Sequence, residues 1–372
     1  MTQFNLLATC ASGLEALVGQ ELRDLGFETA VENGRVRFSG DEKAIAKANY
    51  WLRTADRVKI IVSEFEAKTF DDLFEQIKAL PWEDYLFIDS EFPIRARAQK
   101  SQLMSVSDIQ ALTKKAIVDR LSDVFHKRGR LPETGEKFPI ETAINKDQVL
   151  VTIDTTGPSL FKRGYRTEKG GAPIKETMAA AMVMLTNWKP DKPFHDPVCG
   201  SGTIPIEAAL IGHNIAPGFN REFLFQTWPW FDEKYLEEVM IEAEELANYD
   251  IKLDITGTDI DHRMIEISEN NALEAGLADS ISFKQMQVSD FTTEKTGGII
   301  VANPPYGERL GDEELVIQLY TEMGEAFRPL TTWSKYILTS NLDFEKYYGD
   351  RATKKRKLYN GALRTDYFQY WA

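Results

Sequence analysis

Asp196-Pro197-Val198-Cys199-Gly200-Ser201-Gly202-Thr203 is the stretch that decides the fold of this chain. Phe194–Asp196 predicts the end of a buried strand, and the residues from Thr203 to Leu210 predict a helix. Gly200 and Gly202 permit positive φ and leave no Cβ in the way of a ligand. Strand, glycine turn and helix in this order are typical of the cofactor-binding corner of a doubly wound α/β sheet.

The helix that begins at Thr203 presents free N–H groups and a positive dipole end, which suit the carboxylate of an amino-acid moiety. No Gly-Lys-Ser/Thr follows the turn, and no full Gly-x-Gly-x-x-Gly is present, so neither a phosphate loop nor a dinucleotide fingerprint is indicated. The alternative is an ordinary tight loop. We predict that the turn binds a nucleoside-bearing cofactor through Asp196, Pro197, Cys199, Gly200, Ser201, Gly202 and Thr203.

A second predicted strand, Ile255 to Asp259, ends at an acid, and an amphipathic helix follows from Ile260 to Ala275. An acid at the tip of the strand beside the glycine turn holds ribose hydroxyls in such sheets. We therefore predict Asp259 at the ribose, with Ile260 next to it. Asp261 is the competing candidate, although its position fits a helix N-cap better.

A third strand, Ile281 to Gln285, precedes Ser289-Asp290-Phe291. Asp290 is predicted to accept a hydrogen bond from an adenine amine, and Phe291 is predicted to cover the ring. The alternative for this pair is a simple turn before a loop.

Asn303-Pro304-Pro305-Tyr306 follows a short apolar run, Gly298 to Ala302, that predicts a buried strand. An amine on an aromatic base is a poor nucleophile because its lone pair is delocalised into the ring. The Asn303 side-chain oxygen and the Pro304 carbonyl can each accept one N–H and so free that lone pair. Pro305 stiffens the loop and Tyr306 offers a face for stacking. A Pro-Pro turn without function is the alternative.

Together the two motifs predict an S-adenosylmethionine-dependent methyltransferase that acts on an amino group attached to a π system. No strong general base is needed, because the amine proton becomes acidic only after transfer. In-line positioning of the reactants accounts for most of the predicted acceleration, on the order of 7–11 kcal/mol.

The glycine turn, the stretch Asn303 to Gly311 and the N-terminal region resemble the bacterial guanine-N2 methyltransferases of ribosomal RNA that carry a THUMP domain. The resemblance implies methylation of a guanine 2-amino group in 23S rRNA, with related enzymes acting on tRNA. It also implies that Lys162–Arg166 and Ala172–Ile174 line the entrance for cofactor or RNA. The RNA contacts expected in these motifs are Arg163, Arg166 and Arg309.

The same resemblance implies a Rossmann-like class I methyltransferase domain, with a doubly wound and mostly parallel sheet, preceded by α+β ferredoxin-like and THUMP domains. The predicted β-α-β-α-β order of the first 65 residues suits a ferredoxin-like unit. We therefore expect a ferredoxin-like unit at 1–65, a THUMP domain at 66–156 and a methyltransferase domain at 157–372. The stretch Ile206 to Leu253 is longer than one helix and rich in aromatic residues, and we expect it to pack beside the active site.

The chain has 372 residues and a formal net charge of −14, which is unusual for a protein that binds nucleic acid. Its distribution matters more than its sum. From Arg95 to Arg130 nine basic residues face three acids, a local charge of +6, and Arg95 and Arg97 are therefore further candidate RNA contacts. Salt-dependent nonspecific affinity should be modest.

Two cysteines and four histidines without ligand spacing predict neither a disulfide framework nor a metal site. No signal peptide and no apolar span long enough for a membrane are indicated, so a cytoplasmic enzyme is expected.

Two other functions remain open. Adenine-N6 and glutamine-N5 methyltransferases also use Asn-Pro-Pro-Tyr, although the N-terminal module and Gly307-Glu308-Arg309 favour the guanine enzyme. A noncatalytic RNA-binding assembly factor is the third possibility, and the intact Asp196, Asp259 and Asn303 argue against it.

Overall fold

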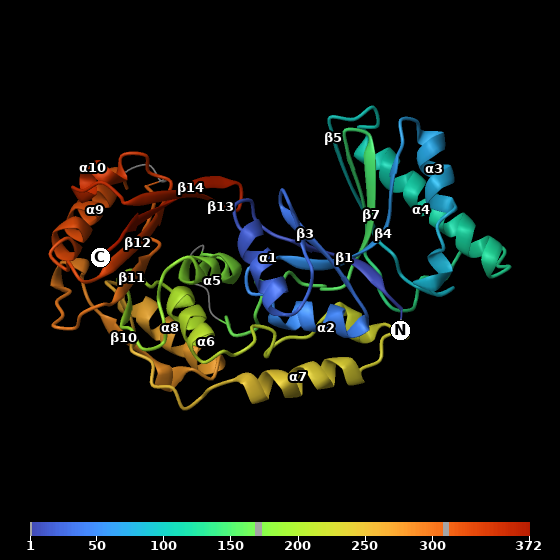
Figure 1. The fold of residues 1–372 in the computed structure, drawn as a ribbon. Coiled ribbons are helices and arrows are strands. Elements are labelled where there is room, and N and C mark those ends of the chain that lie inside the picture. Colours follow the sequence, from blue (N-terminus) through green and yellow to red (C-terminus); the bar gives the residue numbers. More distant parts are fainter. Residues whose placement is uncertain (1, 168–172, 308–311) are drawn as a thin grey trace.

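The computed structural model of the protein describes residues 2–167, 173–307 and 312–372. Two halves follow one another along the chain, and each is built on a seven-stranded sheet (Figure 1). Among the described residues, no helix is long and apolar enough to cross a membrane.

The N-terminal half is an α+β structure. Its helices begin where the sequence supplies caps: the side chains of Asp41, Thr69 and Ser105 accept from the backbone N–H three residues further on. Its elements are β1 (Phe4–Thr9), α1 (Glu15–Asp24), β2 (Ala30–Glu32), β3 (Arg35–Gly40), α2 (Glu42–Trp51), β4 (Arg57–Glu66), α3 (Phe70–Lys78), the 3₁₀ helix η1 (Trp82–Asp84), β5 (Ile94–Gln99), α4 (Val106–Val124), β6 (Ile140–Asn145) and β7 (Gln148–Asp154).

One sheet runs through the whole N-terminal half, in the order β2-β3-β1-β4-β7-β6-β5. The expected ferredoxin-like unit contributes β1 to β4, and the expected THUMP domain contributes β5 to β7. These two sets meet where β4 pairs antiparallel with β7. The boundary at residues 65–66 therefore lies inside a continuous sheet, and it stays a prediction.

The C-terminal half is the doubly wound sheet that the sequence predicted. Its order is β10-β9-β8-β11-β12-β14-β13, in which the first five strands pair in parallel and β14 pairs antiparallel with both β12 and β13. Its elements are α5 (Glu176–Met184), β8 (Phe194–Asp196), α6 (Thr203–Gly212), the 3₁₀ helix η2 (Leu224–Thr227), α7 (Lys234–Leu246), β9 (Ile255–Asp259), α8 (His262–Glu274), η3 (Ala278–Ser280), β10 (Ile281–Gln285), η4 (Val288–Asp290), β11 (Ile299–Ala302), α9 (Glu313–Phe327), β12 (Ser334–Thr339), α10 (Phe344–Tyr348), β13 (Lys354–Asn360) and β14 (Leu363–Tyr370).

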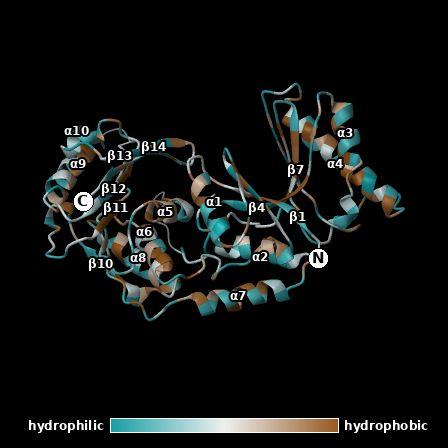
Figure 2. Ribbon diagram, in the orientation of Figure 1, coloured by the Kyte–Doolittle hydropathy of each residue, from teal (hydrophilic) through white to brown (hydrophobic). Residues whose placement is uncertain are grey.

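Hydrophobic residues lie on all sides of α5 and α6, and nearly every residue of both helices is buried. A helix of this kind forms core rather than surface. In Figure 2, by contrast, α7 alternates between hydrophilic and hydrophobic residues, as expected for a helix with one exposed face. The carboxyl ends of β8, β9 and β11 lie at one edge of the sheet, which brings the glycine turn, Asp259 and Asn303 together.

The aromatic insertion between α6 and β9 docks onto the N-terminal half. The indole of Trp228 stacks on Phe138 with 4.8 Å between ring centroids and donates to the Lys137 carbonyl. Trp230 stacks on Phe4 at 5.6 Å and donates to the Tyr85 carbonyl. This stretch was expected beside the active site, and that expectation is wrong. The insertion packs there because the N-terminal half offers its indoles both apolar rings and carbonyl acceptors.

Helix α7 completes this contact. It runs along the underside of the molecule and lies against α2 (Figure 1). The Lys43 ammonium of α2 pairs with Glu238 at 3.0 Å and with Glu242 at 2.7 Å. The acidic charge of this helix is thus partly used to join the two halves.

A buried polar network also crosses between the halves. The Arg163 guanidinium donates to the Arg53 carbonyl at 2.6 Å and lies 3.2 Å from a carboxylate oxygen of Glu207. The Tyr165 hydroxyl donates to the same carboxylate at 2.9 Å. Arg163 is 1 % exposed, so the expected RNA contact of this residue is wrong. The Arg163 guanidinium instead neutralises Glu207, which is fully buried in α6.

Candidate active site

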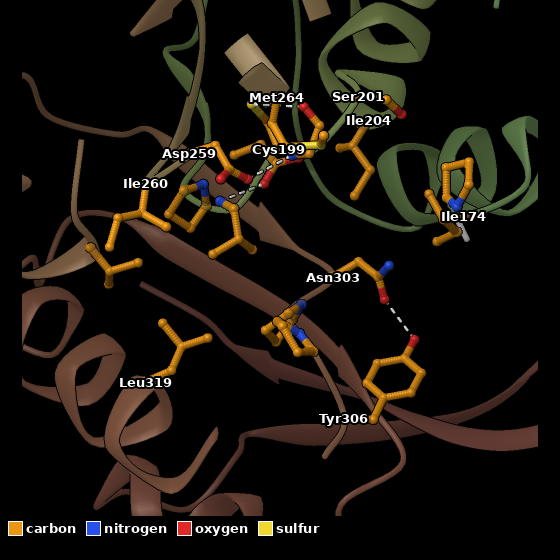
Figure 3. Close-up of a pocket in the computed structure, with 18 of the residues that line it drawn as sticks. Ile174, Cys199, Ser201, Ile204, Asp259, Ile260, Met264, Asn303, Tyr306 and Leu319 are labelled. Atoms are coloured by element: carbon orange, nitrogen blue, oxygen red, sulfur yellow. Dashed lines mark hydrogen bonds between the residues drawn. The ribbon is translucent and has the colours of Figure 1, made fainter. Parts of the chain in front are cut away.

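A cavity of about 1210 Å³ opens at the carboxyl edge of the parallel strands. Figure 3 shows the glycine turn and Asp259 on one side of it, Asn303 and Tyr306 on the other, and Ile174 across from them. The two sequence motifs therefore face the same space. This confirms that they meet at one edge of the sheet.

The glycine turn is held by the neighbouring strand. Cys199 donates its N–H to the Thr258 carbonyl at 2.8 Å, and Gly200 donates to Oδ2 of Asp259 at 3.0 Å. Gly200 and Gly202 have φ values of 51° and 82°, which favour glycine. Strand end and turn are thus locked to each other by hydrogen bonds.

The two glycines have different surroundings. A Cβ added to Gly200 would meet nothing within 4 Å, and Gly200 lines the cavity. A Cβ on Gly202 would lie 2.8 Å from the Cβ of Ser268 in α8, and Gly202 does not line the cavity. Gly200 keeps space open for a ligand, whereas Gly202 allows close packing inside the protein.

Asp259 lies at the cavity wall with both carboxylate oxygens engaged. Besides the Gly200 N–H, it accepts the Asp261 N–H at 2.9 Å. Burial raises the pKa of Asp259, and the nearby Asp261 raises it further. Asp261 itself accepts the Arg263 N–H and caps α8, which confirms the N-cap interpretation of that residue.

Asp196 is the most enclosed acid of the site. Its side chain lines the cavity but is 1 % exposed, and Oδ1 accepts the Val198 N–H at 3.1 Å. Burial raises the pKa of this carboxyl well above its ordinary value, and Asp259 adds to the effect. A polar ligand that donates to Asp196 would compensate this burial.

The end of the cavity beyond Asp259 is more apolar. Figure 3 places Ile260 and Leu319 there, and Met286, Gln287 and Val288 complete the wall. Sequence reasoning missed the last three residues. They follow directly on β10, and Met286 donates its N–H to the Asp259 carbonyl at 3.0 Å. Their position directly after a predicted strand was the sequence feature that could have identified them.

Asp290 and Phe291, which were expected at the adenine, do not line the cavity. The Phe291 ring stacks on His195 with 4.0 Å between centroids, below the strand ends. Phe291 also makes edge contacts with Phe327 and Trp333. The structure thus places this aromatic ring in the core rather than over a ligand.

The Asn303 loop is fixed from two sides. The Tyr306 hydroxyl donates to Oδ1 of Asn303 at 2.6 Å (Figure 3). The Tyr320 hydroxyl of α9 donates to the Pro305 carbonyl at 2.8 Å. Asn303, Pro304, Pro305 and Tyr306 all line the cavity. Tyr320 was not expected from the sequence, because helical periodicity shows that α9 has a buried face but not what it touches.

Arg166 lies behind the cavity wall. Its guanidinium donates to Oγ1 of Thr203 at 2.6 Å and to the Ile174 carbonyl at 2.9 Å, and it lies 3.4 Å from Glu176. The side chain is 12 % exposed, so Arg166 supports the wall and does not present its charge to RNA. Pro173 and Ile174 line the cavity, as the resemblance implied.

Arg309 and Ala172 lie outside the described residues. Arg95 and Arg97 are exposed on β5, the edge strand of the N-terminal sheet, where Arg97 lies 2.9 Å from Glu141. Strand β5 belongs to the other half of the molecule (Figure 1), and neither arginine lines the cavity.

The cavity fits S-adenosylmethionine. The Ser201 and Thr203 hydroxyls and the N-terminus of α6 suit a carboxylate, Asp259 suits ribose hydroxyls, and Gly200 leaves space at the turn. In the described part of the chain, no group of three His, Cys, Asp or Glu residues could hold a metal ion.

Family models match three consecutive parts of the chain. A model described as an RlmL ferredoxin-like domain matches residues 5–59, and one for the THUMP domain matches 67–154. A model described as an RMKL-like methyltransferase domain matches residues 163–369.

Individual proteins resemble the whole chain. "Putative RNA methyltransferase YpsC" of Bacillus subtilis is 56 % identical over 373 residues, covering 100 % of this chain and 97 % of that protein. "Ribosomal RNA large subunit methyltransferase K/L" of Syntrophotalea carbinolica is 33 % identical over 370 residues, with 96 % of this chain and 52 % of that protein covered. The chain thus spans about half the length of the K/L protein.

Solved structures agree. A crystal structure of SMU.472 complexed with SAH has a TM-score of 0.96 at 56 % identity and covers 100 % of this chain and 99 % of that one. A structure described as "a predicted N6-adenine-specific DNA methylase from Listeria monocytogenes" has a TM-score of 0.96 at 60 % identity, covering 100 % and 97 %. Fold, cavity and family matches together confirm the resemblance seen in the sequence: the chain belongs to the family of RMKL-like methyltransferase domains.

Proposed function

We propose that this protein transfers a methyl group from S-adenosylmethionine to the 2-amino group of a guanine in 23S rRNA. The observation that carries the proposal is the shared cavity, in which the glycine turn faces Asn303 and Pro304. The name of the K/L relative supports rRNA as the substrate, and the family supports methyl transfer.

The residues that would hold the cofactor lie along one wall. Ser201, Thr203 and the N-terminus of α6 bind the carboxylate, and Asp259 binds the ribose. Ile260 is 65 % exposed at the cavity, and with Met286 it offers apolar surface to the adenine ring. When bound, the cofactor supplies an electrophilic methyl group.

The opposite wall activates the amine. Oδ1 of Asn303 and the Pro304 carbonyl each accept one N–H, which frees the nitrogen lone pair for attack. Both oxygens also stabilise the positive charge that develops on that nitrogen. Tyr306 lies beside the base, and the apolar residues Ile174 and Pro305 exclude water from the reacting groups.

The N-terminal half binds the RNA away from the reacting base. Arg95 and Arg97 project from the edge strand β5, and the Arg97 side chain is 68 % exposed. Contacts of this kind help to offset the cost of taking a guanine out of its stack, which is a few kcal/mol. We place the reaction in the cytoplasm, where the rRNA substrate is.

Adenine-N6 methylation is the second candidate, because the Listeria structure is named for it. The test is incubation of the full chain with labelled S-adenosylmethionine and, separately, rRNA from cells lacking this protein, tRNA or DNA. Digestion to nucleosides then identifies the product. Label in N2-methylguanosine of 23S rRNA is expected. Label in N6-methyladenine, in tRNA alone, or in no substrate would contradict the proposal.

A further inference from the structure

Along the edge of the C-terminal sheet, the Asn303 loop separates two parts of the cavity. The strands β8, β9 and β10 lie on one side of β11 and carry the glycine turn, Asp259 and Met286. The strands β12, β14 and β13 lie on the other side. The first part holds the proposed cofactor site, so the second part is where the substrate base must enter.

A hairpin tip forms the wall of this second part. β14 runs antiparallel to β12, and Thr339 at the carboxyl end of β12 faces Asp366. The hairpin therefore continues three residues past this pair, from Asp366 to Leu363, where Leu363 pairs with Asn360 of β13. Asn360, Ala362 and Leu363 all line the cavity.

Asn360 is the polar side chain of that tip. Among the described residues, its amide makes no hydrogen bond with the protein. Two other neutral amides of the lining are engaged: Gln318 donates to Glu322 at 2.8 Å, and Oδ1 of Asn303 accepts from Tyr306. Gln287 also lines the cavity, but it follows β10 on the side of the proposed cofactor site. The Asn360 amide is thus a donor and an acceptor available to a ligand.

The chemistry of guanine matches this pair of groups. Its 2-amino group stands beside the N1–H donor, and the O6 acceptor follows on the same edge. In a guanine whose amine is held by Asn303 and Pro304, N1 and O6 lie on the same edge as that amine, and Asn360 lines the same cavity. One amide can accept from N1–H and donate to O6. When the amine is already held by Asn303 and Pro304, adenine and 2-aminopurine leave only the N1 acceptor beside it, without N1–H or O6.

We infer that Asn360 is a specificity-determining residue, which recognises guanine through N1–H and O6 while Asn303 and Pro304 hold the 2-amine. This inference rests on the proposed function. Ala362 and Leu363 supply apolar contact beside it, and the amide does not take part in methyl transfer.

The test compares two synthetic fragments of 23S rRNA that contain the methylated position. One carries guanine there, and the other carries 2-aminopurine, which has the 2-amine but lacks O6 and N1–H. Asn360→Ala is expected to lower kcat/KM on guanine by about 5- to 150-fold, the range for one bidentate base contact. The rate on 2-aminopurine should fall much less, because this base offers the amide one acceptor at N1 and neither N1–H nor O6.

Three controls distinguish a loss of guanine recognition from a loss of folding or cofactor binding. The affinity for SAH and the thermal unfolding midpoint of Asn360→Ala should match the wild type. Asn360→Asp, which keeps an acceptor but cannot donate to O6, should also lose rate on guanine. Gln318→Ala removes a neutral amide from α9 in the same cavity and should leave the guanine to 2-aminopurine ratio unchanged.

Equal methylation of guanine by wild type and Asn360→Ala would overturn the inference and leave the proposed function intact. So would an equal loss on both fragments. If the wild-type protein methylates no guanine in rRNA, the proposed function fails, and the inference fails with it.

Discussion

The hydroxyl of Tyr306 donates a hydrogen bond of 2.6 Å to Oδ1 of Asn303. That oxygen is also the proposed acceptor for an amine N–H. An amide oxygen carries two lone pairs, so Tyr306 takes one and leaves the other for the substrate. The side chain of Asn303 is thus oriented before any base arrives, which lowers the cost of ordering it in the transition state.

Tyr306→Phe keeps the ring and removes this hydrogen bond. We expect kcat to fall about tenfold, the effect of losing roughly 1.4 kcal/mol of one hydrogen bond, with the affinity for SAH unchanged. Single-turnover kinetics and calorimetry measure the two quantities. A variant with wild-type kcat would show that Asn303 is oriented by other contacts.

Asn303→Ala removes the acceptor itself. Because the amine becomes positive only as the methyl is transferred, this interaction acts mainly in the transition state. We expect a loss in kcat of about 10²–10³-fold, comparable to removal of one oxyanion-hole donor, while SAH still binds. Loss of SAH binding together with a normal single-turnover rate would contradict this role.

Gly200→Val and Gly202→Val should affect different properties, namely cofactor binding and thermal stability. In Gly200→Val the new side chain would project into the cavity at a φ of 51°, so SAH binding should be lost, and stability should fall only by the backbone strain. The Gly202 side chain would press on Ser268, and thermal stability should fall first. Calorimetry with SAH and thermal unfolding, applied to both variants, would refute the distinction if the two behaved alike.

Arg163→Ala should destabilise the protein because it leaves Glu207 buried without its partner. Breaking a buried ion pair from one side costs about 3–5 kcal/mol of unfolding free energy. The matched control is Arg97→Ala, because the Arg97 side chain is exposed and its partner Glu141 keeps a second cation, Lys59; this change should cost about 0–1 kcal/mol. Denaturant unfolding measures both. If Arg163→Ala unfolded like the wild type and only lost RNA affinity, the structural role would be refuted.

His195 should make stability depend on pH. Burial lowers the pKa of its imidazole to about 3 in the folded protein, against an ordinary value near 6.5 in the unfolded chain. Between these values the unfolded state binds more protons, so stability is lost as pH falls from about 6.5 toward 3. Urea midpoints of wild type and His195→Phe should diverge over this range, with the wild type losing more. Parallel curves would exclude the effect.

The sequence predicted most of what local chemistry determines. The strand, glycine turn and helix around Asp196, and the buried strand before Asn303, follow from periodicity and glycine positions. Asp261 was identified correctly as an N-cap because an N-cap has a local signature. These features depend on neighbours within a few residues.

Long-range contacts were not predictable in the same way. Nothing local shows that Arg163 is neutralised by Glu207, 44 residues further along the chain. The same holds for Phe291, which follows η4 and whose partner His195 is on strand β8. A sequence pattern does not distinguish an arginine that binds RNA from one that neutralises a buried acid. Nor does it distinguish an aromatic ring that covers adenine from one that packs in the core. The hairpin tip with Asn360 was likewise not identified, because its position follows from strand pairing.

Trp228 and Trp230 fasten the aromatic insertion to the N-terminal half, which has a consequence for substrate choice. The separation between the edge strand β5 and the amide of Asn303 is set by protein packing and not by the RNA. The protein therefore holds strand β5 and Asn303 at a fixed separation. Under the proposed function, an RNA whose docking surface and target base lie at a different spacing contacts β5 or reaches Asn303, but not both.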